Sequence, residues 1–255
     1  MRSPVVIQRS LGEPLRDLAR NMERLLRSRS SEAAAMFATA LRTRGPGPAV
    51  LLVDQRVMDR LHPPTRTAEA EGFDPTDPPT GTALQQLCLV VASGACVCLS
   101  PALASELAAE LPPPEPVPGT RVVALCVPRL DALARQLPGE PLEELVELVW
   151  LHELIHWAHG ATSVNLASKH AEEAVTQIAL ASILREHSRG PELRQVMDAV
   201  AAMQPEHYRT YQALVPPPLP RPGSARAQDE PAAPISKAEL LELIQTADEV
   251  FELDK

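Results

Sequence analysis

The sequence predicts an α+β fold, in which a small mixed sheet packs against long helices. Three observations support this prediction. Short apolar runs of strand length lie in the first half of the chain, and long helical patterns occupy its beginning and its second half. Segments rich in proline and glycine separate these runs. A length of 255 residues allows one good-sized core with an appended segment.

The N-terminal part is predicted to be helical over residues 13–44, ending before the breaker "RGPGP". Apolar residues recur there at helical spacing, and arginines fill the positions between them; the apolar set is Leu15, Leu18, Met22, Leu25 and Leu26. This pattern predicts an amphipathic helix with a solvated basic face. A DNA- or lipid-contacting role for the basic face is the alternative.

Four apolar runs are strand candidates, at residues 49–54, 87–92, 95–99 and 121–127. The second and third flank Ser93-Gly94, which predicts a hairpin. Residues 62–82 are dense in Pro, Thr, Asp and Gly, and we expect a loop there, of the length that often forms a lid or a binding rim. Short helices are expected at residues 101–111 and 129–137.

The second half of the chain is predicted to begin with two long helices after Pro141, separated by a turn at Gly160. Gly190-Pro191 is expected to end the second, and shorter helices follow to residue 214, so that residues 1–214 form the main domain. Residues 215–235 are rich in proline and predict an extended linker. Residues 236–255 predict one amphipathic helix, which either docks on the main domain or binds a protein partner.

The composition excludes several classes of function. A net charge of −9 argues against a nucleic-acid partner, because phosphate binding depends on clustered Lys and Arg. The sequence has no signal-peptide or membrane-span pattern, which predicts a cytoplasmic protein without membrane contact. The four cysteines are too few for a disulfide framework; Cys88, Cys96, Cys98 and Cys126 all lie in apolar runs, where we expect core strands rather than metal ligands.

The chemistry is concentrated in "WLHELIHWAHG", residues 150–160, inside a helical run that is apolar nearly all round. His152 and His156 are four residues apart, so their Cβ atoms lie roughly 5–6 Å apart on one helix face. This spacing suits two nitrogen ligands of a tetrahedral Zn²⁺ site. Glu153 follows the first ligand, and a buried carboxylate there requires a partner or a function.

A third ligand is expected from the helix predicted over residues 168–187, with Ser168 as its N-cap. Its core face is Ala171, Ala174, Val175, Ile178 and Ala181. Glu172 and Glu173 flank this face on opposite sides, so either could supply the ligand. His159 is a weaker alternative, since it lies at a helix end, where a cation complements the helix dipole. The remaining candidates, His62, His170 and His187, are expected at the surface.

The run "HELIHWAHG" followed by "AEEAVTQIALASIL" resembles the zincin-like peptidase module of ArdC-type antirestriction proteins and, more loosely, the ImmA/IrrE metallopeptidases. The likeness covers about 35 residues. It implies a gluzincin-type zincin fold, and its E-A-x-x-D pattern falls on residues 173–177, which favours Glu173 over Glu172 as third ligand. Gln177 stands where that pattern has an acidic residue. The N-terminal part does not resemble the DNA-binding domain of ArdC proteins, so the antirestriction function is not carried over.

The resemblance implies a zinc metallopeptidase that hydrolyses a peptide bond in a protein substrate, with Glu153 as general base on zinc-bound water. A stabiliser of the transition state is expected among His207, Tyr208 and Tyr211; the alternative is a helix with packed tyrosines. Substrate would add to a sheet edge, formed by one of the strand candidates from residue 87 onward. The alternative function is a zincin-fold regulatory or binding module, whose metal site is structural or occluded and which acts through its C-terminal helix.

Overall fold

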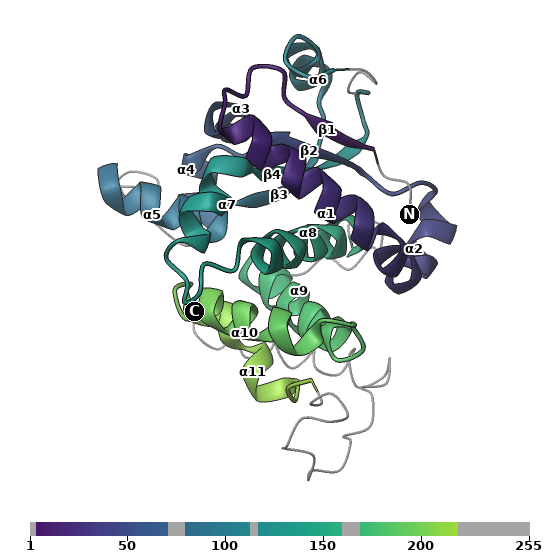
Figure 1. The fold of residues 1–255 in the computed structure, drawn as a ribbon, viewed down its shortest axis with the longest axis vertical. Coiled ribbons are helices and arrows are strands. Elements are labelled where there is room, and N and C mark those ends of the chain that lie inside the picture. Colours follow the sequence, from purple (N-terminus) through teal and green to yellow (C-terminus); the bar gives the residue numbers. More distant parts are fainter. Residues whose placement is uncertain (1–3, 71–79, 113–116, 160–168, 219–255) are drawn as a thin grey trace. The chain divides into compact units, whose positions relative to one another are not determined.

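The computed structural model describes residues 4–70, 80–112, 117–159 and 169–218 (Figure 1). Contacts within the chain divide it into two compact units, Met1–Thr162 and Ser163–Lys255. The first unit contains the sheet and the helix with the HExxH motif, and the second contains helices among its described residues. The protein is therefore α+β with a small mixed sheet, as the sequence predicts.

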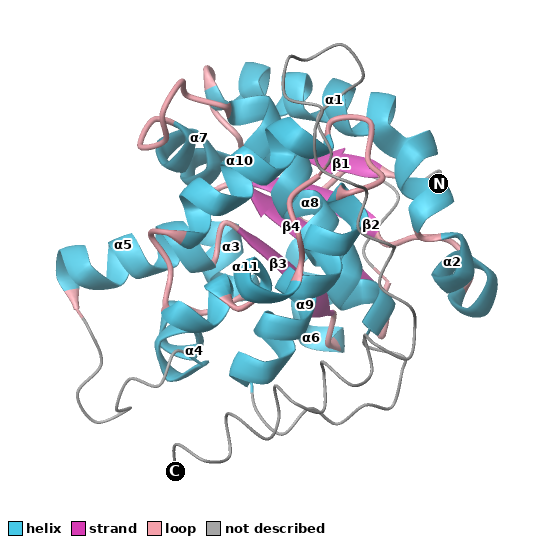
Figure 2. Cartoon of the chain, turned by 90° about the horizontal axis from the view of Figure 1, so that it is seen from below, coloured by secondary structure: helices cyan, strands magenta, loops and turns pink. Residues whose placement is uncertain are grey.

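The sheet has four strands in the order β1-β2-β4-β3 (Figure 2). Their bounds are Val5–Ile7 for β1, Ala49–Val53 for β2, Gly94–Cys98 for β3 and Arg121–Cys126 for β4. The first three in spatial order are parallel, whereas β3 pairs antiparallel with β4 and lies at the edge. The centre of the sheet is built from the apolar strands β2, "AVLLV", and β4, "RVVALC", in which continuous apolar runs are typical of strands buried on both faces.

The register of β3 on β4 defines two faces of the sheet. Ala95 lies opposite Ala124 and belongs to the apolar cluster that also contains Met58 and Leu107, from helices α3 (Gln55–Leu61) and α6 (Pro101–Ala108). The alternate residues of β3 face the other way, because side chains along a strand alternate between the faces. That second face receives the helix with the HExxH motif.

Two further helices of the first unit pack against this motif helix, α8 (Leu142–His159). The helices α1 (Leu15–Met36) and α7 (Val127–Ala134) contact it, and α8 itself contacts β3 and β4. The predicted helix at 13–44 is confirmed but divided at Phe37, after which α2 (Ala38–Arg44) follows. The buried residues Ala19, Met22 and Leu26 form the apolar face of α1.

The second unit is helical in its described part. The helix α9 (Lys169–Leu184) contacts α10 (Gly190–Ala201), the 3-10 helix η1 (Glu206–Arg209) and α11 (Tyr211–Leu214). The predicted core face of α9 is confirmed: Ala171, Ala174, Val175, Ile178 and Ala181 are all buried. Gly190-Pro191 begins α10 rather than ending α9, because a proline fits the first turn of a helix, where no backbone donor is needed.

Two predictions about the region 62–99 are wrong. Instead of a hairpin around Ser93-Gly94, the helix α5 (Gly81–Val91) precedes β3, and Ser93 Oγ donates to Leu89 O at its end. Short apolar runs fit a buried helix as well as a strand, and the run at residues 87–91 belongs to the helix α5. The predicted 62–82 loop contains α4 (Pro64–Ala70), which starts at a proline, and the first residues of α5.

Other features differ from the prediction in smaller ways. The strand β1 was not predicted, because "VVI" is too short to show an alternating pattern. Cys88 lies in α5 rather than in a strand, and Cys98 is exposed rather than in the core. Most of the predicted linker, from residue 219 onward, lies outside the described residues. The predicted C-terminal helix and the predicted turn at Gly160 also lie outside them. None of the described helices combines the length and the apolar character that a membrane crossing requires.

Candidate metal centre

The helix α8 forms because its ends and its interior both suit a buried helix. Leu145 N donates to Pro141 O over 2.9 Å in the first turn, where Glu143 and Glu144 complement the positive end of the dipole. Between Leu145 and Trp157, buried residues lie on all sides of the helix, as expected for a helix that is apolar all round. The two charged residues buried in this interior are Glu147 and Glu153.

The two motif histidines point their Nε2 atoms at each other. The atoms lie 3.0 Å apart, and the rings have centroids 4.7 Å apart at an interplanar angle of 70°. Both side chains are half-buried. Two imidazole nitrogens at this separation can both lie about 2.0–2.1 Å from one Zn²⁺ ion, which is the usual zinc–nitrogen distance. The pair His152 and His156 therefore fits two adjacent coordination positions of a single ion.

Glu153 is packed against the edge strand. Glu153 is 6% exposed. A Cβ atom built on Gly94 would lie 2.8 Å from Oε1 of Glu153 and 3.0 Å from Cγ of Glu153. The same Cβ would lie 2.6 Å from Cγ1 of Val149, one turn earlier on α8. The absence of a side chain at Gly94 thus lets β3 approach the helix closely. Sequence reasoning missed Gly94, although a lone glycine in a strand is itself a signal of close backbone approach.

Two charged contacts hold α8 in place within the first unit. The buried Glu147 forms an ion pair with Arg29 of α1, with 3.4 Å between Oε1 and Nε. At the other end of the helix, Arg121 Nη1 donates to His156 O over 3.5 Å. Arg121 begins β4 opposite Cys98 of the edge strand. Neither contact was predicted, because both depend on long-range pairing of elements.

The candidate third ligands lie on α9 in the second unit. Glu172 and Glu173 are both half-buried in its first turns, and Glu172 O accepts a hydrogen bond from Thr176 Oγ1. One turn later, Gln177 is 6% exposed, and its Oε1 is a buried oxygen with no hydrogen-bond donor in the described part of the chain. A buried amide oxygen of this kind can accept an N–H from a ligand histidine, which is a common role beside zinc sites.

His207 and Tyr208, two of the predicted stabilisers, are buried in the short helix η1. The His207 ring stacks on His170, with centroids 4.4 Å apart at 23°, and lies 4.4 Å from the Tyr208 ring. Burial, together with the neighbouring His170, lowers the pKa of His207 to about 4, and the Glu173 carboxylate opposes the shift. His207 is therefore a neutral imidazole at pH 7.

Tyr211, the third predicted stabiliser, is fully buried in a different environment. Its hydroxyl donates to Asp198 Oδ1 over 2.7 Å, and the Arg194 guanidinium lies 4.6 Å from its ring centroid. Burial and the hydrogen bond to Asp198 raise the pKa of Tyr211. These contacts tie α11 to α10, so the hydroxyl of Tyr211 serves the packing of these helices.

The remaining histidines differ in how deeply their side chains are buried. His62, His159 and His170 are half-buried. His187 is 7% exposed, so its predicted surface position is wrong. Its Nδ1 accepts a hydrogen bond from Arg189 N over 3.0 Å, which closes the turn after α9.

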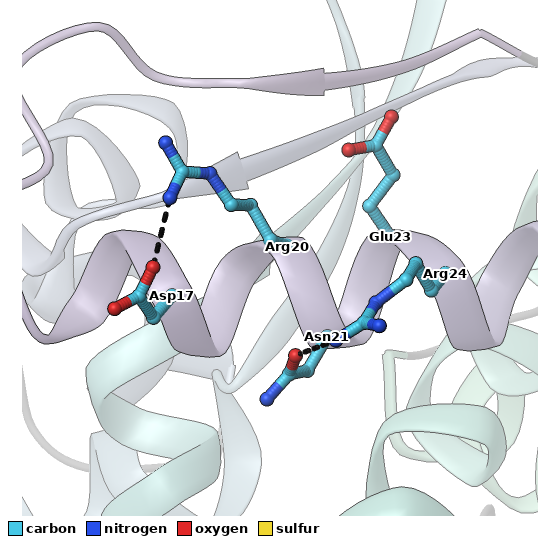
Figure 3. Close-up of a pocket in the computed structure, with 5 residues that line it drawn as sticks. All are labelled: Asp17, Arg20, Asn21, Glu23 and Arg24. Atoms are coloured by element: carbon cyan, nitrogen blue, oxygen red, sulfur yellow. Dashed lines mark hydrogen bonds and ion pairs between the residues drawn. The ribbon is translucent and has the colours of Figure 1, made fainter.

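The basic face of α1 forms a shallow surface hollow lined by Asp17, Arg20, Asn21, Glu23 and Arg24 (Figure 3). Arg20 donates to Asp17 Oδ1 over 2.8 Å, and Figure 3 shows Arg24 pointing back to Asn21. Arg20 and Arg24 thus each donate a hydrogen bond to a side chain three residues earlier on the same helix. This arrangement is typical of the exposed face of a helix.

Comparison of the chain with protein-family models, with curated proteins and with solved structures finds no match.

Proposed function

We propose that this protein is a zinc-dependent metallopeptidase with a zincin-like fold. The observation that carries the proposal is the pair of half-buried Nε2 atoms of His152 and His156, 3.0 Å apart on α8, followed in sequence by the buried carboxylate of Glu153. A structural zinc site requires ligands but no adjacent acid or base, whereas hydrolysis requires one. Glu173 is the proposed third ligand, giving two imidazoles and one carboxylate as the donor set.

Zinc bound to this donor set would act as a Lewis acid that polarises the scissile carbonyl. Glu153 would accept a proton from the attacking water and return it to the leaving amine. Its packing against Gly94 limits the directions in which the carboxylate can turn, which helps to hold it in a reactive position. His207 is the favoured stabiliser of the transition state, because Tyr211 is already bound to Asp198; Tyr208 is the alternative.

The residues around the proposed ligands fit a zinc site. Gln177 has a buried amide oxygen that accepts no hydrogen bond from the described residues, and an oxygen of this kind is a common companion of zinc ligands. Arg121 binds the carbonyl of His156, which fixes the helix end that carries the second ligand. An amide at position 177 departs from the acidic residue of the resembling families but keeps the accepting oxygen.

The edge strand β3 is the proposed binding site for substrate. It pairs with β4 on one side only among the described strands, and its first residue, Gly94, lies against Glu153. An extended peptide that added to the free edge would run past the catalytic carboxylate. The substrate would therefore be an extended or unfolded segment of a protein.

The second candidate function is a zincin-fold regulatory or binding module that acts through its C-terminal segment. In that case the histidine pair would hold a metal with no catalytic role. The position of Glu153 directly after the first proposed ligand supports the peptidase over this alternative, because a metal with no catalytic role needs no acid or base beside its ligands.

The proposal is tested by metal analysis of the purified full-length protein. We expect one zinc ion per chain in wild type and in Glu153→Gln, and loss of zinc in His152→Ala and His156→Ala. The variant His62→Ala, outside the proposed ligand set, is the control and should retain zinc. Zinc retained by both ligand variants would overturn the proposal.

A further inference from the structure

Arg121 is placed where it can reach both the proposed catalytic helix and the edge strand. It begins β4 and lies opposite Cys98 of β3 in the register of the two strands. Its Nη1 donates to His156 O over 3.5 Å, so the side chain lies on the face of the sheet that α8 covers. Gly94, which touches Glu153, faces the same side, because it lies an even number of residues from Cys98.

The guanidinium of Arg121 is half-buried, but its one polar contact in the described part of the chain is this long bond to a carbonyl. The other partly or fully buried arginines of the first unit each have a carboxylate partner; these pairs are Arg16–Glu13, Arg29–Glu147, Arg60–Glu110 and Arg129–Asp59. A guanidinium has five N–H donors, and one bond to a helix end leaves most of them available. Arg121 therefore differs from these arginines in having no acidic partner among the described residues.

We propose that Arg121 binds a carboxylate of the peptide substrate and makes the protein selective for acidic peptides. This inference rests on the proposed peptidase function and names the substrate class of the same site. Arginine binds carboxylates with two parallel hydrogen bonds, which gives both charge and direction to the contact. The carboxylate would come from an Asp or Glu side chain or from the C-terminus of the peptide.

The reach of the side chains permits this contact. Neighbouring strands lie about 4.8 Å apart, so a peptide added to the edge of β3 would run about 10 Å from β4. An arginine and a glutamate together span that distance. The residues of β3 on this face are Gly94, Cys96 and Cys98, and all three are too short to block the path.

The test measures peptide binding to zinc-loaded, full-length Glu153→Gln protein, which should bind peptides without cutting them. The probes are octapeptide pools of three kinds. In the first two, the peptides are acetylated and amidated, and either Glu or Gln is fixed at each position in turn. The peptides of the third kind have a free C-terminal carboxylate. We expect one Glu position, or the free carboxylate, to tighten binding by at least about tenfold. A second substitution, Arg121→Gln, in this background should remove that preference. The control substitution Arg42→Gln, which replaces an exposed arginine of α2, should leave the preference unchanged.

Each outcome decides the inference. No binding of any pool, equal binding of the Glu, Gln and free-carboxylate pools, or a preference that survives Arg121→Gln would overturn it. A lower melting temperature of Arg121→Gln with an unchanged preference would mean that Arg121 only caps α8. If the preference depends on Arg121 but wild type cuts no pool, carboxylate binding stands and the peptidase function falls.

Discussion

The backbone of Gly94 lies directly against the side chain of Glu153, so closely that a methyl group at position 94 would come within 2.8 Å of the carboxylate. This contact joins the edge strand of the sheet to the acidic residue of the HExxH motif. It explains why a glycine occurs in an otherwise apolar strand. It also connects the two parts of the proposed mechanism, the strand that would bind substrate and the residue that would move the proton.

The first prediction concerns this contact. Gly94→Ala should lower the free energy of unfolding by about 1–3 kcal/mol, because the added methyl group overpacks the space between β3 and α8. The cost should be smaller in a Glu153→Ala background, although Val149 would still be crowded. Gly12→Ala is the matched control, since a Cβ there meets nothing within 4 Å. Urea unfolding of the metal-free variants measures the coupling, and equal costs in both backgrounds would refute the contact.

A second prediction concerns the ion pair between α1 and α8. Arg29→Ala should destabilise the protein by about 3 kcal/mol, because it leaves the Glu147 carboxylate buried without its cation. The control is Glu23→Ala, which breaks the more exposed pair with Arg27 on α1 and should cost less than about 1 kcal/mol. Thermal and urea unfolding compare the two. Similar small losses would show that Glu147 is solvated in the folded protein.

The third prediction is a pH effect on stability. Burial raises the pKa of the Cys126 thiol to about 11 from an ordinary value of 9.0. The unfolded thiol therefore loses its proton first, and this contribution to stability is complete below pH 9 and lost as the pH rises to 11. The loss should approach about 2–3 kcal/mol. Urea unfolding at pH 8 and pH 10.5 should show a steeper decline for wild type than for Cys126→Ala; parallel declines would contradict the assignment.

Much of the fold follows from local pattern. The helix α8 could be predicted because Pro141, the acidic first turn and the apolar run all favour the same structure. The central strands β2 and β4 are short, continuous apolar runs rich in Val and Leu, and such runs favour a buried strand. By contrast, "LQQLCLVV" fits a helix and a strand equally well, and only its packing against α4 and α7 selects the helix α5.

The residues of the candidate site also differ in how far the sequence predicts them. His152, Glu153 and His156 could be predicted, because their spacing within one helix determines their relative positions. The contacts of Gly94 and Arg121 with α8 could not be predicted, because they depend on the order β4-β3 at the sheet edge and on the register of Cys98 with Arg121. Strand order is a property of long-range pairing and leaves no mark on the local sequence.

The fourth prediction distinguishes the two candidate third ligands. Glu173→Gln should weaken zinc binding at least about tenfold, whereas Glu172→Gln should leave it nearly unchanged, since one carboxylate is proposed to bind the metal. Both residues are half-buried on the same helix, so each variant is the control for the other. Competition with a chromogenic chelator measures the affinities. The reverse order of effects would assign the ligand to Glu172.

The most direct test of the central claim compares wild type and Glu153→Gln, both loaded with zinc, for cleavage of a whole proteome. We expect wild type to produce new peptide ends and Glu153→Gln to reduce their formation by at least about 10²-fold at an unchanged zinc content, since the variant lacks the base. Stoichiometric zinc in both proteins with no cleavage that depends on Glu153 would contradict the account.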